Sequence, residues 1–296
     1  MGNLSLEKKK KLSSFRRIAI GTWRTAYDPQ VYGSVTLRMD EALRYIEAFR
    51  QATGEHLTVT HMMAKVVGKV LEAMPDANAI LRFNRIYVRK DIGVFFQVAM
   101  ADERTGEIDL SGVTVRDPEQ KSLKEIIEDF SARAAKVRAG KDKELESTRK
   151  TFKSIPFALL NFVLKALSFF TYTLNLDLRW AGVPKDPFGS AMVTNIGSIG
   201  LEEAYPPLVP YSRVPLLISM GAVTDAPVVE DGQLKVGKAM RIFATFDHRI
   251  LDGTHAARMV KILKAWFEDP FTHFDAVESL EVKAKATEPD GAGVGA

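Results

Sequence analysis

The sequence contains no cysteine. This absence excludes disulfide bonds, cysteine metal ligands and catalysis by a thiolate. It agrees with a reducing compartment, where disulfides are rare. We therefore expect a cytoplasmic protein whose chemistry depends on other side chains.

The sequence also lacks a strong charge of one sign. It has 41 basic and 37 acidic residues, a net charge of +4, which gives no reason to expect a nucleic-acid partner. Part of the basic excess lies in the lysines at 8–11 and in Arg16 and Arg17, and no apolar segment of a secretory signal follows them. We expect residues 1–14 to be a flexible basic arm, with docking to an anionic surface as the alternative.

Linkers and internal repeats are missing as well. A hydrophobic content of 46% is enough for a substantial core, and we expect one domain over residues 15–282. Residues 283–296 are rich in alanine, glycine and charge, which predicts a disordered tail.

Apolar periodicity predicts alternating helices and strands. We expect helices at residues 39–51, 58–73, 123–139 and 254–267, and strands at 86–88, 92–100, 191–193, 216–220 and 240–247. This order predicts a two-layer mixed α/β domain, in which helices pack on one face of a mixed β-sheet.

Residues 154–176 are almost wholly apolar. Their polar residues recur every three or four positions, which predicts a helix with one narrow polar stripe and a broad apolar face. These polar residues are Asn161, Lys165, Ser168, Tyr172 and Asn175. The stretch is long enough to cross a bilayer, but Lys165 near its centre would cost about 2.5–3.5 kcal/mol, so we reject a spanning helix.

Three interpretations of this apolar stretch stay open. The helix is buried against the same protein or a neighbouring subunit, or it is a lid over an apolar acyl site. Alternatively it lies on a membrane surface, supported by the cations Arg149, Lys150 and Lys153, and the protein is then membrane-associated.

A histidine at the end of an apolar strand is the main candidate for proton chemistry. His248 is followed by Arg249 and, after a short turn, by Asp252 and Gly253. Side chains alternate along a strand, so Asp247 points away from His248 and is a poor triad partner. We expect Asp252 to bind backbone amides or a distant arginine and so to shape the loop that presents His248. The alternative is a structural histidine at a strand end.

A second polar segment, Thr194-Asn195-Ile196-Gly197-Ser198-Ile199-Gly200, also follows an apolar strand. Its glycine spacing does not fit the phosphate-binding patterns GxGxxG or GxxxxGK(S/T). A plain turn is one interpretation of this segment, and a hydroxyl donor at Thr194 is the other.

The two segments together resemble a known family. Residues 247–253 are similar to the DHRxxDG signature of dihydrolipoyl acyltransferases, the core subunits of 2-oxo acid dehydrogenase complexes, and chloramphenicol acetyltransferase has a related HxxxDG pattern. Residues 194–200 resemble the (S/T)NxGxxG segment of the same enzymes. Further similar segments lie at residues 15–19, 75–78, 121–126, 134–141 and 221–232.

The resemblance implies a chloramphenicol-acetyltransferase-like fold, a homotrimer or larger assembly of trimers, and acyl transfer with coenzyme A (CoA) and no metal. It assigns His248 as the general base and Thr194 as the donor to the oxyanion, with Asp252 as a third catalytic residue. It also implies a salt bridge between Arg16 and Asp252. Residues expected to support the site are Arg16, Arg249, Gly253 and Asn195.

The acceptor implied by the resemblance is a dihydrolipoyl thiol on another protein, or else a hydroxyl group. The chain has no lipoyl domain and no peripheral-subunit-binding domain, so we expect no covalent lipoyl group on it. The family's G-L-x-V-P segment is degraded at residues 108–113, and an apolar helical insertion occupies about residues 145–189. The alternative function is a non-catalytic oligomeric scaffold or membrane-associated assembly protein.

Overall fold

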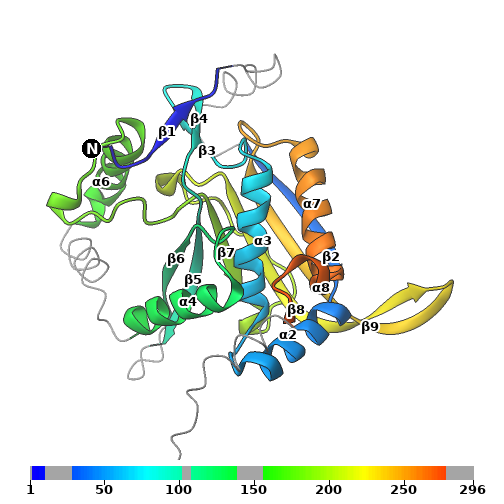
Figure 1. Cartoon of the computed structure of the whole chain (residues 1–296). Helices are drawn as coiled ribbons and strands as arrows, with labels where there is room; N and C mark the ends of the chain where they lie inside the picture. The colour runs from blue at the N-terminus through cyan, green and yellow to red at the C-terminus, as the bar shows by residue number, and fades with distance from the viewer. Residues whose placement is uncertain (1, 11–28, 102–107, 139–155, 278–296) are drawn as a thin grey trace, which may run out of the picture.

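The computed structural model describes residues 2–10, 29–101, 108–138 and 156–277. These residues form a large mixed sheet of six strands, in the order β2-β9-β8-β7-β5-β6, and a small sheet in the order β1-β4-β3 (Figure 1). The large sheet contains β2 (Gln30–Arg38), β5 (Gly93–Ala101), β6 (Ile108–Arg116), β7 (Ala191–Asn195), β8 (Leu216–Glu230) and β9 (Gln233–Asp247). The small sheet contains β1 (Leu6–Lys8), β3 (Ala79–Arg82) and β4 (Arg85–Arg89).

Helices α3, α4 and α7 cover one face of the large sheet, as the sequence predicts (Figure 1). The main helices are α2 (Asp40–Thr53), α3 (Val59–Ala73), α4 (Leu123–Arg138), α6 (Phe157–Ser168), α7 (Gly253–Glu268) and α8 (Pro270–His273). Short helical turns are the π-helix η1 (Phe169–Thr173) and the 3₁₀ turns η2 (Arg179–Ala181), η3 (Ile196–Ile199) and η4 (Pro210–Ser212).

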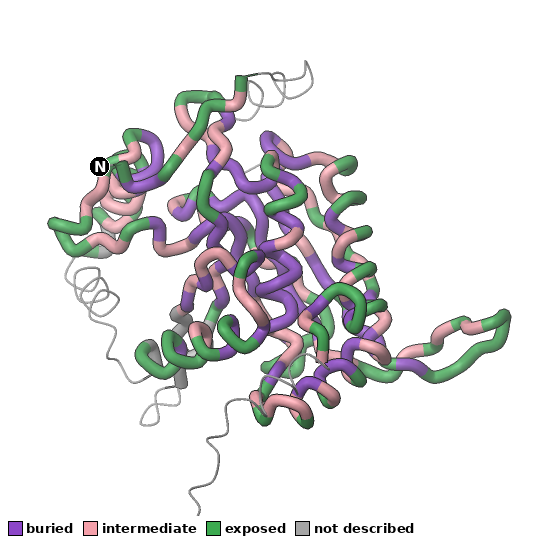
Figure 2. The backbone as a smooth tube through the Cα atoms, viewed as in Figure 1, coloured by how far each residue is buried: buried purple, intermediate pink, exposed green. Residues whose placement is uncertain are grey.

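Helix α3 lies at the centre of the hydrophobic core. Met62, Val66 and Val70 are 3% exposed or less and belong to one cluster with the inner face of the sheet (Figure 2). Burying a side chain of this size contributes about 1.5–3 kcal/mol. The packed helix–sheet layer is therefore the rigid support from which the strand ends project.

Strands β8 and β9 form a hairpin longer than the sequence predicts. Each has 15 residues, and the pair extends beyond the body of the molecule to a turn at Asp231 and Gly232 (Figure 1). The distal part carries the exposed apolar side chains Val229, Leu234 and Val236. The predicted strands, residues 216–220 and 240–247, cover only the part of the hairpin that packs on the core. The distal part, whose side chains have no core beneath them, was not predicted.

The prediction of a flexible arm over residues 1–14 is wrong for residues 2–10. Leu6–Lys8 form β1, which pairs antiparallel with β4. Leu4 is buried in a cluster with Ile80 and Tyr172. Apolar burial and strand pairing outweigh the solvation of the neighbouring lysines. Residues 11–14, and the tail predicted for residues 283–296, lie outside the described residues.

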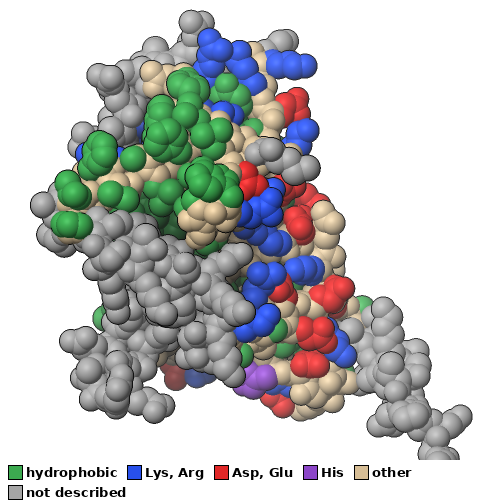
Figure 3. Space-filling model, turned by 90° about the vertical axis from the view of Figure 1, so that its left-hand side faces the viewer, with side chains coloured by type: hydrophobic (Ala, Val, Ile, Leu, Met, Phe, Trp, Pro, Cys, Tyr) green, Lys and Arg blue, Asp and Glu red, His purple; other side chains and the backbone are tan. Residues whose placement is uncertain are grey.

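The described part of the insertion begins as a helix, α6 and η1; Asn161 and Lys165 of its predicted polar stripe are exposed, but the later polar residues face inward. Its polar side chains Ser168 and Tyr172 are buried, and the Asn175 side chain bonds to both the amide and the carbonyl of Leu4. In contrast, Leu159, Phe162 and Trp180 are 53%, 72% and 85% exposed. Figure 3 shows hydrophobic side chains gathered on the face of the molecule where α6 lies.

The structure bears on the rejected membrane-spanning helix and on burial of the insertion within the same chain. In the part of the chain that the structure describes, no helix has the length and apolar character needed to span a membrane. The apolar face of α6 is not buried against the described part of the same chain. A membrane surface and another subunit therefore remain the two candidates for what covers this face.

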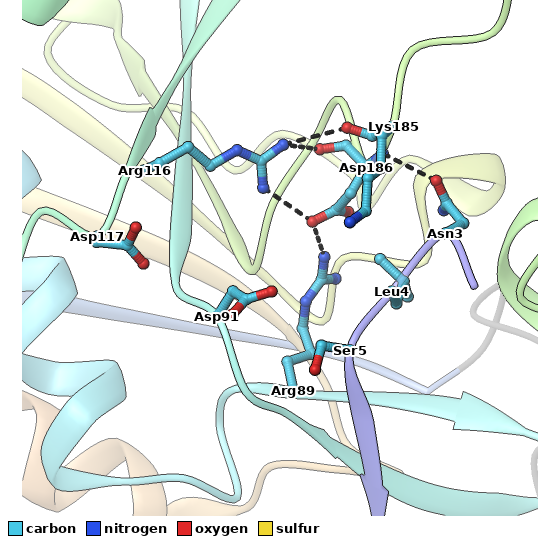
Figure 4. Close-up of a pocket in the computed structure, with 9 residues that line it drawn as sticks. All are labelled: Asn3, Leu4, Ser5, Arg89, Asp91, Arg116, Asp117, Lys185 and Asp186. Atoms are coloured by element: carbon cyan, nitrogen blue, oxygen red, sulfur yellow. Dashed lines mark hydrogen bonds and ion pairs between the residues drawn. The ribbon is translucent and has the colours of Figure 1, made fainter. Parts of the chain in front are cut away.

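A cluster of ion pairs holds the end of the insertion on the sheet. Asp186 contacts Arg89 of β4, and its carboxylate also accepts a 3.0 Å hydrogen bond from Arg116 of β6 (Figure 4). Burial alone raises the pKa of Asp186, but the two arginines outweigh it and hold the pKa below its ordinary value.

The ion pairs border a cavity of about 320 Å³ (Figure 4). Its described lining has three cations and three carboxylates, so its charges balance. These charged residues are Arg89, Arg116, Lys185, Asp91, Asp117 and Asp186. The cluster therefore serves as an anchor for the insertion.

Candidate active site

His248 lies immediately after β9, where its backbone amide donates a 2.7 Å hydrogen bond to the carbonyl of Pro29. Its half-buried ring contacts the carbonyl of Leu251 through Nδ1 at 2.8 Å. A carbonyl only accepts hydrogen bonds, so Nδ1 carries the proton and the lone pair of the neutral ring is on Nε2. This tautomer is the one that a general base acting through Nε2 requires.

Asp247 takes no part in the hydrogen bond that orients the imidazole at Nδ1. Both of its carboxylate oxygens bind the guanidinium of Arg249, at distances of 2.6–3.1 Å. Both residues of this pair are buried, with exposures of 4% and 8%. The pair joins the residues on either side of His248, and the supporting role of Arg249 stays a prediction.

Asp252 is the N-cap of α7, and it binds backbone amides as the sequence predicts. Its Oδ1 accepts hydrogen bonds from the amides of Thr254 and His255, at 3.0 and 3.2 Å, and from the Thr254 hydroxyl. Partial burial raises the pKa of Asp252, but the hydrogen bonds from Thr254 and His255 outweigh it and lower the pKa below its ordinary value. The capped helix start lies directly after the loop that carries His248.

Gly253 is the first residue of α7 and has open space where a Cβ would lie. The described residues give no steric reason for glycine there, so its supporting role stays a prediction. Arg16, the partner predicted for Asp252, lies outside the described residues.

Thr194 and Asn195 are the last two residues of β7. The Asn195 side chain accepts a 3.1 Å hydrogen bond from the amide of Ser198 and donates a 3.2 Å bond to the hydroxyl of Thr60. These contacts tie the end of β7 to the start of α3. Thr194 is half-buried and pairs with Ser219 of β8.

Within one chain, the structure does not bring Thr194 and His248 together. Thr194 is level with Ser219, which pairs in turn with Phe243 of β9. His248 lies five residues further along that strand, a distance of roughly 17 Å, and two strand spacings of roughly 5 Å separate β7 from β9. The two candidate groups therefore lie too far apart within one chain to reach the same substrate carbonyl.

The sequence did not predict one contact of the candidate base itself and one neighbour of the two residues that flank it. The carbonyl of Leu251 is its hydrogen-bond partner at Nδ1, and Arg213 lines the same pocket as Asp247 and Arg249. A backbone carbonyl carries no residue-specific signal, and Arg213 lies in an irregular loop. No sequence motif marked either feature. Within the described ranges, no three His, Cys, Asp or Glu side chains are placed to hold a metal ion.

Comparison with known proteins supports the resemblance. The family model of the 2-oxoacid dehydrogenases acyltransferase (catalytic domain) matches residues 5–155 and 188–274. The interval between these two segments, residues 156–187, contains α6, η1 and η2. The insertion is therefore the part of this chain that departs from the family.

Two curated proteins of Bacillus subtilis are among the relatives. The dihydrolipoyllysine-residue acetyltransferase component of the acetoin cleaving system is 25% identical over 73% of this chain and 43% of its own length. The lipoamide acyltransferase component of the branched-chain alpha-keto acid dehydrogenase complex is 22% identical over 75% of this chain and 42% of its own length. This chain thus spans less than half the length of these relatives.

Solved structures show the same fold. A probable dihydrolipoamide acetyltransferase from Listeria monocytogenes has a TM-score of 0.62 at 18% identity, covering 92% of this chain and 98% of that one. Chloramphenicol acetyltransferase has a TM-score of 0.51 at 12% identity, covering 89% of this chain and 100% of that one. With a family model that matches most of its length, the chain belongs to the 2-oxoacid dehydrogenase acyltransferase catalytic-domain family.

Proposed function

We propose that this protein is a CoA-dependent acyltransferase that moves an acyl group between CoA and a thiol or hydroxyl acceptor. The observation that carries the proposal is the geometry of His248. A main-chain carbonyl holds its Nδ1 proton, so Nε2 can accept a proton from the acceptor.

The proposed reaction needs no covalent intermediate on the protein. Nε2 of His248 removes the proton of the acceptor, whose sulfur or oxygen attacks the thioester carbonyl of acyl-CoA. The hydroxyl of Thr194 donates a hydrogen bond to the resulting oxyanion. When the tetrahedral intermediate collapses, the C–S bond to CoA breaks and His248 returns the proton to the leaving thiolate.

The proposed site is shared between two copies of the chain. Within one chain His248 and Thr194 lie too far apart to reach one carbonyl, so one carbonyl can meet both only if each comes from a different copy. We propose a homotrimer, or a larger assembly of trimers, as the form in which this happens. The proposed natural acceptor is a dihydrolipoyl group on a separate protein acting in trans, with a small hydroxyl compound as the alternative.

Replacing His248 tests this function. We expect His248→Ala to lower the release of CoA thiol from acetyl-CoA, in the presence of dihydrolipoamide, by about 10²–10⁴-fold, because the acceptor loses its base. The matched control is His273→Ala, an exposed histidine on α8, which we expect to leave the rate unchanged. Equal rates for wild type and His248→Ala with both thiol and hydroxyl acceptors would contradict the proposal.

We propose, as a second function of the chain, peripheral attachment to a membrane through residues 154–176, in the cytoplasm. The exposed apolar side chains of α6 and η1 support it, because contiguous apolar patches on soluble proteins mark interaction sites. If the protein has no catalytic activity, the proposed alternative is an oligomeric scaffold at the membrane surface.

Liposome flotation tests the attachment. We expect wild-type protein to float with vesicles containing anionic lipid, and the double variant Leu159→Ser, Phe162→Ser to float several-fold less because apolar insertion is lost. The control Leu234→Ser removes an apolar side chain that is at least as exposed, from the β8–β9 hairpin. Equal flotation of the double variant and wild type would rule out attachment through α6.

A further inference from the structure

A pocket of about 390 Å³ lies between the insertion, the loop at residues 208–214 and the end of β9. Its volume falls within the range of about 300–1,000 Å³ that is common for small-molecule sites. One wall comes from α6, which lies in the interval that the family model does not match. The pocket is therefore a feature of this chain's insertion and not of the shared fold.

The deeper wall of the pocket is apolar. Leu208, Val214 and Ile250 are buried at 3–4% exposure, and the half-buried Leu164 of α6 faces them across the pocket. Such a wall favours an apolar group over bulk water. It does not by itself define the ligand.

The rim of the pocket carries excess positive charge. Lys165, Arg213 and Arg249 contribute three cations, and Asp247 is the only acid among the described residues that line the pocket. Both oxygens of Asp247 are already bound by Arg249. The charges of Lys165 and Arg213 are therefore not balanced within this lining.

Arg213 is held in place at this rim. Its Nε donates a 2.8 Å hydrogen bond to the buried hydroxyl of Ser168 on α6, which links the loop to the insertion. Desolvation and the nearby charge of Arg249 lower the pKa of Arg213. Because Asp247 already pairs with Arg249, the guanidinium of Arg213 is the one that a bound anion would stabilise beside this apolar wall.

We propose that this pocket binds an anionic amphiphile. Its carboxylate or phosphate head group lies between Lys165 and Arg213, and its apolar body lies against Leu164, Leu208 and Val214. Asp247 and Arg249 line the pocket, whereas the intervening His248 does not. Binding in this pocket is therefore a separate event from acyl transfer, and it does not depend on the proposed catalytic function.

Calorimetric titration of the full chain tests the proposal directly. The probes are octyl phosphate and octanoate below their micellar concentrations. Inorganic phosphate, which has no apolar chain, and octyl glucoside, which has no charge, are the controls. We expect both anionic amphiphiles to bind, and the tighter of the two identifies the head group. Binding of inorganic phosphate as tight as that of octyl phosphate would overturn the apolar half of the proposal. Equally tight binding of octyl glucoside would overturn the anionic half.

Two variants locate the site. We expect Arg213→Gln and Lys165→Gln each to weaken binding of the preferred amphiphile by about tenfold or more, because each removes a charge-assisted contact. Lys165 is exposed on a helix surface, so its replacement leaves the fold intact even if Arg213→Gln destabilises the loop. The matched control Arg258→Gln removes an exposed arginine from α7 and should bind like wild type. Unchanged binding by both pocket variants would refute the site.

Discussion

At the residue scale, the acids flanking His248 have structural rather than catalytic partners. Asp247 forms a bidentate pair with Arg249, and Asp252 caps α7. The imidazole is oriented at Nδ1 by the carbonyl of Leu251. A base held by a main-chain carbonyl keeps its tautomer without a carboxylate, so the site differs from a Ser-His-Asp triad.

The cap at Asp252 should be measurable as stability. We expect Asp252→Ala to lower the free energy of unfolding by about 1 kcal/mol, because the amides of Thr254 and His255 lose their acceptor. Asp252→Asn keeps a capping oxygen and should lose less. Urea denaturation at neutral pH measures both variants, and an unchanged midpoint for Asp252→Ala would contradict this assignment.

The polar partners of the candidate site could be predicted only in part. Strand alternation indicated that Asp247 faces away from His248, and the position of Asp252 before a helix indicated a capping role. The bond from His248 to Leu251 could not be predicted, because it depends on a turn in which the amides of Ile250 and Leu251 bond to the carbonyl of Asp247. Neither local propensity nor side-chain chemistry encodes such a backbone contact.

At the element scale, the sequence predicted most helices and strands but not the orientation of the insertion. Helix periodicity predicted one polar stripe, but Ser168 and Tyr172 are buried whereas Asn161 and Lys165 are exposed. Which face points inward depends on what the polar side chains meet, and here Asn175 bonds to the backbone of Leu4 while Ser168 accepts from Arg213. Leu4 lies just before β1, in the segment that was predicted to be a flexible arm, and Arg213 lies in an irregular loop.

Helix α3 contains a titratable group that makes its stability depend on pH. His61 is 6% exposed, and its Nδ1 accepts a 3.2 Å hydrogen bond from the amide of Thr58 at the helix start. Burial, with a smaller effect from His56, lowers the pKa of His61 to about 4. Because the folded-state pKa is below the unfolded value, the stabilisation is complete above about pH 6.5 and is lost as the pH falls toward 4.

We therefore expect acidification from pH 7 to pH 5 to cost the wild type about 2 kcal/mol through His61. His61→Gln keeps a side-chain acceptor at the helix start and removes the titration. Over the same pH interval its free energy of unfolding should therefore fall by about 2 kcal/mol less than that of the wild type. Urea denaturation of both proteins at the two pH values measures the difference. Equal losses would show that His61 does not resist protonation in the folded state.

At the scale of the whole molecule, the central sheet separates the two candidate catalytic groups. Each group is held at a strand end by contacts within its own chain, yet the distance between them excludes a common substrate carbonyl. A closed ring of identical subunits brings one surface of each copy against a different surface of the next. Such a ring would place Thr194 of one copy beside His248 of its neighbour.

The most direct test of this shared site is complementation between two inactive variants. His248→Ala and Thr194→Val are coexpressed with different affinity tags, and mixed oligomers are purified through both tags and assayed for CoA release. Each variant alone should be strongly impaired, whereas a mixed trimer that carries both tags regains about one site in three if each site takes its base and its hydroxyl from different chains. Mixed oligomers with no more activity than the separate variants would contradict the account.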